Sequence, residues 1–121
     1  MGARINYIFN EGENEPAVWL YSHWGEDEWQ VKLATALAHA RPRWNDTPYC
    51  IRMIISHMIQ HEVLDETGYG IGAVSKPSNF AAWDFTVDVD MVGKTVEGHS
   101  WEEFIAYHAG ITVPPLEPAS V

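Results

Sequence analysis

The segment NDTPYCIRMIISHMIQ, residues 45–60, carries the clearest core-forming pattern in the chain. Its apolar side chains recur at helical spacing and form one broad face: Ile51, Ile54, Ile55, Met58 and Ile59. Asp46 or Thr47 can cap the free amides where a helix begins, and Pro48 suits its first turn. We therefore predict an amphipathic helix that runs to about Thr67, where the glycines of GYG end it.

A second helix is predicted before this one, from Glu26 to about Arg41. Its apolar positions also have helical spacing: Trp29, Leu33, Ala36, Leu37 and Ala40. Acidic residues fill its expected first turn, where the helix dipole favours them. Pro42 disfavours helical geometry in the residue before it, so the helix is expected to stop there.

Strands are predicted on both sides of the two helices. Residues 4–9 (RINYIF) and 17–24 (AVWLYSHW) read as a hairpin, and residues 81–92 (AAWDFTVDVDMV) alternate most clearly between apolar and polar. Residues 69–75 (YGIGAVS) fit a short strand or an extended loop, and GKTVEG turns the chain back. A last helix follows, with a capping box between Ser100 and Glu103 and a stop at Gly110.

This order of elements predicts an α+β fold, with an antiparallel or mixed sheet of four to five strands and about three helices on one face. We expect residues 1–110 to form a single domain. Residues 111–121 contain several prolines and are predicted to be an extended tail.

Composition excludes some partners. The 121 residues carry a formal net charge of −10, which disfavours extended nucleic acids and anionic membrane surfaces. The single cysteine, Cys50, cannot form an internal disulfide, and no apolar stretch is long enough to cross a bilayer. A cytoplasmic protein without a membrane partner is the expectation.

Three arginines gather between and on the two central helices: Arg41, Arg43 and Arg52. They lie close to a predicted helix N-terminus, and guanidinium groups suit phosphate or carboxylate ligands. Trp44 and Tyr49 flank them and could stack on a base. The alternative interpretation is that these arginines pair with the abundant acids of the chain.

The segment YSHWGEDEW, residues 21–29, lies where a strand is expected to meet a helix. Gly25 fits that corner, which leaves His23 and Trp24 without a structural role. They could line a pocket with the arginine segment. Further along, the glycines of GYGIG lack the strand-to-helix context of a phosphate loop, although they permit close approach, and Tyr69 and Lys76 could add to a pocket.

Catalytic and metal motifs are weak. His57 and His61 have a zinc-binding spacing in HMIQH, but Gln60 stands where an inverted zincin has its acid, and Asp65 is the nearest third ligand. Neither a resident metal nor another cofactor is predicted. No nucleophile motif occurs, so an enzyme would need residues that the fold brings together, such as His23 and Glu62.

Three stretches, LYSHWG, RPRWNDTPYCIRMII and DETGYGIG, resemble small uncharacterised proteins encoded by bacteriophages and their bacterial hosts. The resemblance covers residues 19–71. It implies a context, since small phage proteins often counter host defence by binding a host protein or sequestering a nucleotide signal. It assigns no functional residues.

The leading hypothesis is a small non-enzymatic binding protein, monomeric or homo-oligomeric, that sequesters a small anionic or nucleotide-derived signalling molecule. Its predicted ligand-binding residues are Arg41, Arg43, Arg52, Trp44, Tyr49, His23 and Trp24. An alternative is an acidic inhibitor that imitates nucleic acid and binds a host protein. Its binding surfaces would be GEDE and the strand face that carries Asp84, Asp88 and Asp90. The second alternative is a hydrolase or lyase that uses histidine and carboxylate.

Overall fold

A mixed six-stranded sheet underlies the fold in the computed structural model, which describes residues 4–23, 28–75 and 85–113. In this part of the chain the strands follow the order β3-β2-β1-β4-β5-β6. Their bounds are β1 Ile5–Asn10, β2 Ala17–Ser22, β3 Tyr69–Val74, β4 Thr86–Asp90, β5 Thr95–Val96 and β6 His99–Ser100.

The predicted hairpin is present, because β1 and β2 pair antiparallel. β3 adds to the outer side of β2, also antiparallel, and β4 lies parallel to β1 on its other side. β5 and β6 are short antiparallel strands that extend the sheet beyond β4. Because β1 and β4 are parallel and the other pairs are antiparallel, the sheet is mixed. A mixed sheet was one of the two arrangements predicted from the sequence.

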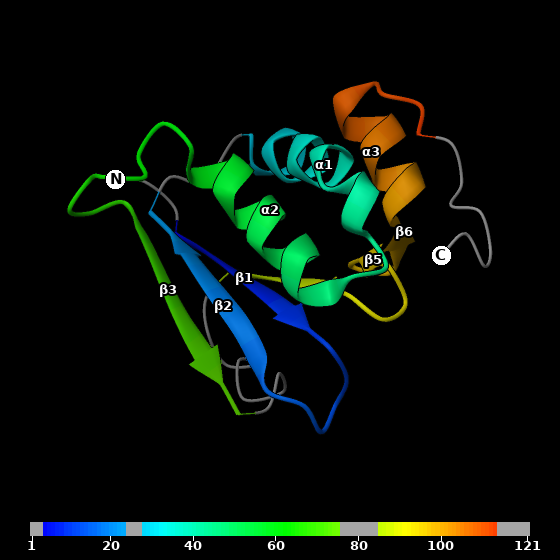
Figure 1. The fold of residues 1–121 in the computed structure, drawn as a ribbon. Coiled ribbons are helices and arrows are strands. Elements are labelled where there is room, and N and C mark those ends of the chain that lie inside the picture. The colour runs from blue at the N-terminus through cyan, green and yellow to red at the C-terminus, as the bar shows by residue number, and fades with distance from the viewer. Residues whose placement is uncertain (1–3, 24–27, 76–84, 114–121) are drawn as a thin grey trace.

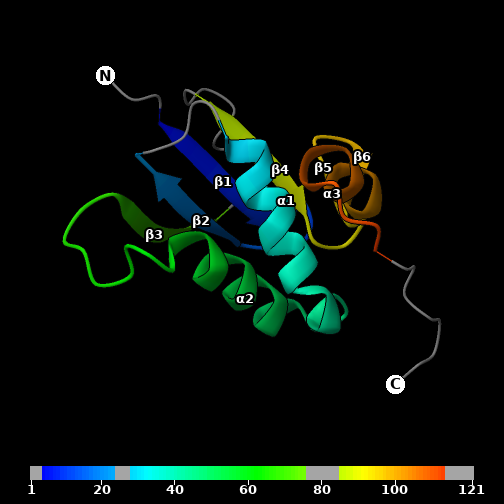
Figure 2. The ribbon, with the colours of Figure 1, turned by 90° about the horizontal axis from the view of Figure 1, so that it is seen from above.

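Three helices cover one face of this sheet (Figures 1 and 2): α1 Trp29–His39, α2 Thr47–Ile59 and α3 Trp101–Ala109. A short 3-10 turn, η1 Arg41–Arg43, links α1 to α2. Seen from above, α1 lies between α2 and α3, and α3 lies beside β5 and β6 (Figure 2). The described residues thus confirm the α+β class.

The main core lies between the helices and the sheet. Alternate residues of β1, namely Ile5, Tyr7 and Phe9, are buried against it. The helices contribute a set of fully or nearly fully buried side chains: Leu33, Ala36, Leu37, Ile54, Met58 and Ile105. The apolar faces predicted from helical spacing are therefore the faces that pack on the sheet.

Two tryptophans form the centre of this core beneath α1 and α3. The rings of Trp44 and Trp101 meet edge to face, with centroids 5.1 Å apart. The indole N–H of Trp44 donates to the Leu37 carbonyl at 2.9 Å, and that of Trp101 donates to the Thr95 carbonyl at 3.2 Å. Both polar edges are satisfied, so these large side chains can be buried without an unpaired donor.

Helix ends show which local signals decided the boundaries. α3 confirms its predicted caps, since Glu103 N–H donates to Ser100 Oγ at 3.1 Å and Gly110 adopts the left-handed conformation with φ 69°. α2 ends at Ile59, so the predicted extension to Thr67 was wrong. Its apolar face stops there, and Glu62 N–H bonds instead to the Ile59 carbonyl in a tight turn at 2.8 Å.

α1 begins at Trp29, later than predicted, with Glu28 at its N-cap position. Of the acids expected in its first turn, Glu28 thus precedes the helix, and Glu26 and Asp27 lie outside the described residues. No described helix is long and apolar enough to cross a membrane.

The opposite face of the sheet carries a smaller cluster of Ile8, Ala17 and Val74, with Trp19 packed on it. Trp19 donates from its indole nitrogen to Asn6 Oδ1 at 2.8 Å. Its ring lies over β3 at Gly72, where an added Cβ would come within 2.7 Å of Trp19 Cε3. This close contact agrees with the prediction that the GYGIG glycines permit close approach.

Gly72→Ala is expected to destabilise the protein, because the new methyl group overlaps the Trp19 ring. We expect a loss of about 1–3 kcal/mol in the free energy of unfolding, as for other overpacked sites. Gly70 is the matched control, since it shares the strand and the face but has nothing within 4 Å of an added Cβ. Gly70→Ala should stay within about 1 kcal/mol of the parent chain. Equal losses in urea unfolding would contradict this account.

Candidate functional site

The arginine segment is spread over the outer side of η1 and α2. Arg43 Nη1 lies 3.7 Å from Asp46 Oδ2, and its guanidinium lies 5.2 Å from the Tyr49 ring centroid. Arg52 Nη1 donates to Ser56 Oγ at 3.5 Å, one helical turn along α2. The alternative interpretation of acid pairing is therefore realised at Arg43.

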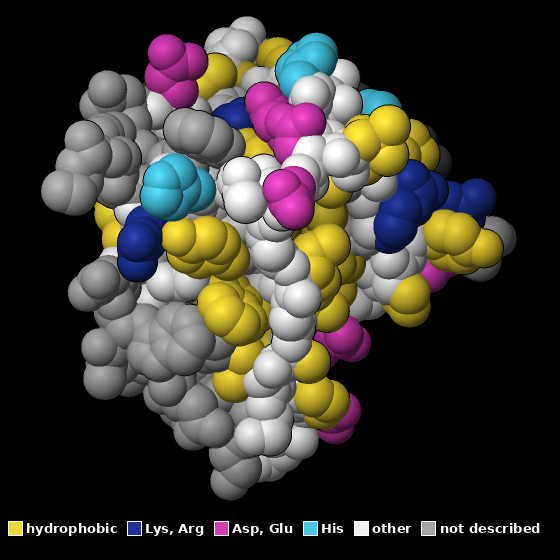
Figure 3. Space-filling view, turned by 90° about the vertical axis from the view of Figure 1, so that its left-hand side faces the viewer, with side chains coloured by type: hydrophobic (Ala, Val, Ile, Leu, Met, Phe, Trp, Pro, Cys, Tyr) yellow, Lys and Arg dark blue, Asp and Glu magenta, His cyan; other side chains and the backbone are white. Residues whose placement is uncertain are grey.

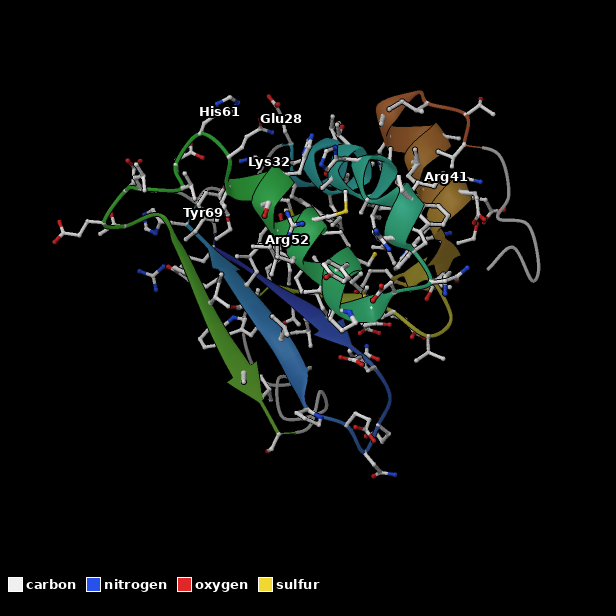
Figure 4. The ribbon with its side chains drawn as sticks, in the orientation of Figure 1. Glu28, Lys32, Arg41, Arg52, His61 and Tyr69 are labelled. Carbon is white, nitrogen blue, oxygen red and sulfur yellow. The ribbon has the colours of Figure 1, made fainter. Side chains whose placement is uncertain are left out.

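These residues do not converge on one point. Arg41 and Arg52 lie well apart in Figure 4, the first beside the end of α1 and the second in the middle of α2. Trp44 is 1% exposed, so it belongs to the core and has no face to stack on a ligand; its predicted stacking role was wrong. Tyr49 is exposed and packs against Arg43.

His23 lies in another part of the molecule. It follows β2, and its backbone N–H donates to the Gly68 carbonyl at 2.9 Å, immediately before β3. Helix α1, with 11 residues, spans about 16 Å and separates this end of the sheet from Arg41. Sequence reasoning expected His23 to face the arginine segment; the structure places it beside the GYG stretch. Trp24 lies outside the described residues.

Two polar pairs lie where β2 ends and β3 begins, in a region that we call the β2–β3 corner. Lys32 and Tyr69 lie with Ser22 on the helix-covered face of the sheet, and Tyr21 and His23 lie on the opposite face. The register places Ser22 opposite Tyr69. Lys32 Nζ donates to Tyr69 OH at 2.6 Å, and Tyr21 OH lies 3.4 Å from His23 Nδ1. Figure 4 shows Lys32 and Tyr69 on the same side of the molecule as Glu28 and His61.

Two buried residues with hydroxyl groups, Ser22 and Tyr7, lie at this corner. Ser22 is 2% exposed. Tyr7 is also buried, and burial, together with the neighbouring Tyr69, raises the pKa of Tyr7 well above its usual value. The Tyr7 phenol therefore stays protonated at neutral pH and can serve as a hydrogen-bond donor.

Lys32 is in an unfavourable place for helix stability. It lies at the end of the first turn of α1, where the helix dipole disfavours a cation, and no acid occupies that turn. A 2.6 Å bond to Tyr69 of β3 holds the lysine there. Lys32 was not among the binding residues predicted from the sequence. Tyr69 was predicted as a possible pocket residue because of the glycines around it. Lys76, predicted with it, lies outside the described residues.

A groove of about 830 Å³ lies on the far side of α1, beside α3 and the β5–β6 turn. Its described lining combines aromatic rings, imidazoles and carboxylates: Trp29, Gln30, Val96, Glu97, His99, Glu103, Phe104, Ala106, Tyr107 and His108. Trp29 packs against Phe104 with centroids 6.2 Å apart. The described lining contains no lysine or arginine, so this groove is a poor site for an anion.

The histidines of HMIQH do not assemble a metal site in the described residues, which contain no group of three or more His, Cys, Asp or Glu able to hold one. His57 instead stacks on His39 of α1, with ring centroids 4.9 Å apart. Its Nδ1 is buried and has no hydrogen-bond partner among the described residues. Burial first, then the neighbouring His39 and His61, lowers the pKa of His57.

Stability is therefore expected to fall as the pH drops from 7 to 5. The folded state lowers the pKa of His57 below its unfolded value of about 6.5, so it favours the neutral ring. This contribution is complete above the unfolded pKa and is lost as the pH falls through the folded one. His57→Gln should flatten the fall in the free energy of unfolding, measured in urea; His99→Gln, at an exposed site, should not. An unchanged slope in His57→Gln would refute the assignment.

Three acids of β4 and the β5–β6 turn have structural partners. Asp90 Oδ1 accepts backbone N–H bonds from Val92 and Gly93, each at 3.0 Å, and Glu97 Oε2 accepts one from Asp88 at 2.7 Å. Asn10 Nδ2 donates to Asp88 Oδ1, while burial raises the pKa of Asp88. Asp84 and most of GEDE lie outside the described residues, so the acidic-inhibitor alternative stays a prediction.

Two further candidates for chemistry are placed by the structure. Cys50 is buried, and burial raises its pKa to about 11, so its thiol is a poor nucleophile at neutral pH. Glu62 is half-buried in the turn after α2, which agrees with the end of the helix lying at the edge of the core.

The described residues define a small α+β fold in which a lysine from α1 bonds to a tyrosine of β3 at one end of the sheet. No family model matches the chain, and neither a curated protein nor a solved structure matches it. The resemblance to small phage proteins thus stays a prediction. Residues 20–22 of the first stretch, LYSHWG, pair with residues 69–71 of the third, DETGYGIG, at the β2–β3 corner.

Proposed function

We propose that this is a non-enzymatic binding protein that holds a small anionic ligand at the β2–β3 corner. The observation that carries the proposal is the bond of 2.6 Å between Lys32 Nζ and Tyr69 OH. The backbone of His23, at the end of β2, bonds to Gly68 just before β3. We thus retain the binding function inferred from the sequence but assign charge recognition to Lys32 in place of the arginines.

The hydrogen-bond arrangement suits an anion. An ammonium group has three protons, so the bond to Tyr69 leaves Lys32 able to donate to a ligand. Because Lys32 donates to the phenol oxygen, the phenol proton of Tyr69 points elsewhere and is a second donor. Bonds from charged donors to phosphate or carboxylate are about twice as strong as neutral ones.

The ligand is expected to be small. A chain with net charge −10 repels polymeric nucleic acids, whereas a single local cation can still bind a compact anion. A nucleotide-derived signal, as the phage context implies, is the specific ligand that we propose within this class.

Adenosine monophosphate and adenosine form a matched pair of probes, because they differ by the phosphate group. We expect the monophosphate to raise the melting temperature and adenosine to leave it unchanged. Mass spectrometry of the purified, denatured protein should release a phosphorylated or carboxylated small molecule if one is retained. Equal binding of both probes, or no binding of the monophosphate, would contradict the proposal.

The groove beside α3 favours a second candidate, the binding of an organic cation such as a quaternary ammonium. Tyr107, 84% exposed, and Trp29 offer ring faces, while Glu97 and Glu103 supply negative charge. Benzyltrimethylammonium should then bind more tightly than the neutral neopentylbenzene, and Tyr107→Ala should weaken it. Lys32→Met should have no effect on this site, which separates the two candidates.

A further inference from the structure

The outer edge of the sheet is formed by β3, and among the described residues this strand pairs with β2 alone. Figure 3 looks directly at this side of the molecule: a run of white backbone crosses the middle of the view, with yellow apolar side chains on both sides. The sequence YGIGAV contains neither proline nor a charged residue. Natural proteins usually protect a strand edge with such residues, so this edge is unusually open to pairing.

The register identifies which groups face outward. Because His23 N–H bonds to the Gly68 carbonyl, the alternation of an antiparallel ladder directs the backbone groups of Gly70, Gly72 and Val74 toward β2. The N–H and C=O groups of Tyr69, Ile71 and Ala73 consequently point away from the sheet. They form a regular row of donors and acceptors, spaced for another strand.

Exposed apolar residues accompany this row. Ile71 is 62% exposed in the middle of the strand, and Leu64, in the turn that leads to β3, is 94% exposed. Large exposed apolar side chains beside backbone groups that pair with no described strand are typical of interaction surfaces.

We propose that β3 is the interface of a two-fold symmetric homodimer, in which the β3 strands of two copies pair antiparallel about Ile71. In this register Ile71 lies opposite its symmetry mate, and Tyr69 lies opposite Ala73 of the other copy. Each of these residue pairs exchanges two backbone hydrogen bonds. The two sheets become one continuous sheet, and the interface is isologous, as two-fold symmetry requires.

Charge does not oppose a second copy at this edge. Two chains of net charge −10 repel each other over most of their surface, whereas β3 is uncharged. The nearest acids, Asp65 and Glu66, precede the strand. In an antiparallel pair centred on Ile71, each of these acids lies roughly 33–40 Å from its counterpart along an extended chain, beyond the screening length of about 8 Å at physiological salt.

The inference goes beyond the proposed function and does not depend on it, because the dimer uses the backbone of Tyr69 and leaves its side chain bonded to Lys32. Because pairing does not use the side chains proposed to bind the ligand, the dimer should form without ligand. Pairing also places Ala73 of the other copy beside the β2–β3 corner.

Sedimentation equilibrium of the whole chain, across the micromolar range and without ligand, tests the proposal. We expect a mass about twice the 13.7 kDa of one chain. Ile71→Pro should give the monomer mass while keeping the circular dichroism spectrum, since the N–H that it removes faces outward and not toward β2. Ile71→Lys is the second variant, in case the proline disturbs the strand.

Val92→Lys is the matched control, since Val92 is 68% exposed in the turn after β4 and carries the same added charge away from β3. It should remain a dimer. A monomeric parent chain would overturn the proposal, even if the β3 edge were then found to bind a strand of another protein. Folded Ile71→Pro and Ile71→Lys variants that stay dimeric would overturn it as well, as would a monomeric Val92→Lys.

Discussion

Trp101→Ala is expected to lower the free energy of unfolding by about 3–5 kcal/mol, the usual cost of removing a buried tryptophan. Trp101 is fully buried, packs edge to face on Trp44 and donates its indole N–H to the Thr95 carbonyl. Its removal leaves a cavity under α3 and takes away the indole bond to the Thr95 carbonyl of β5. For a domain with a typical stability of 5–15 kcal/mol, this loss approaches the point of unfolding.

The same helix supplies the control. Tyr107 is 84% exposed, so Tyr107→Ala should change the free energy of unfolding by less than about 0.5 kcal/mol. Trp101→Phe keeps most of the packing and loses the indole bond, so it should fall between the two. Urea unfolding followed by circular dichroism measures all three. A Trp101→Ala variant as stable as Tyr107→Ala would show that the core is placed incorrectly.

Lys32→Met is expected to weaken binding of adenosine monophosphate by roughly 10–100-fold, since a charge-assisted hydrogen bond contributes about 1.5–3 kcal/mol and 1.4 kcal/mol is tenfold in affinity. Methionine keeps much of the volume and apolar stem of lysine, so folding should persist. Isothermal titration calorimetry at low salt gives the two dissociation constants. Tyr69→Phe should produce a smaller loss, because it removes a neutral donor.

Two sets of control variants locate the effect. Lys94→Met removes the same charge at a site where Nζ lies 6.0 Å from the Trp101 ring centroid, and it should leave the affinity nearly unchanged. Arg41→Ala with Arg43→Ala tests the site that the sequence predicted, and it should also bind normally. If the arginine variants lost binding and Lys32→Met did not, the ligand site would lie on η1 and α2.

Local signals in the sequence predicted a large part of the fold. The capping box and glycine stop of α3, the apolar face of α2 and the β1–β2 hairpin each depend on residues close together in the chain, and each is present. Contacts between residues far apart in the chain could not be predicted from such local signals. The parallel pairing of β1 with β4 joins residues about 80 positions apart, such as Asn6 and Thr86, and no local pattern specifies it.

The candidate site shows the same limit. His23 was selected because no structural role explained it, and the structure places it at the β2–β3 corner. Lys32 and Tyr69 are 37 positions apart, and on its own helix Lys32 fits an ordinary surface lysine. Trp44 was assigned to a ligand from its arginine neighbours, whereas its packing is decided by Leu37 and Trp101, which the helices bring together.

The most direct test of the central claim is NMR chemical-shift mapping of the labelled protein during titration with adenosine monophosphate. The account predicts shifts concentrated at Lys32 and Tyr69, which saturate together, with Arg43, Arg52 and the groove beside α3 unchanged. Shifts confined to the arginines or to that groove, or no saturable shift at the β2–β3 corner, would contradict it.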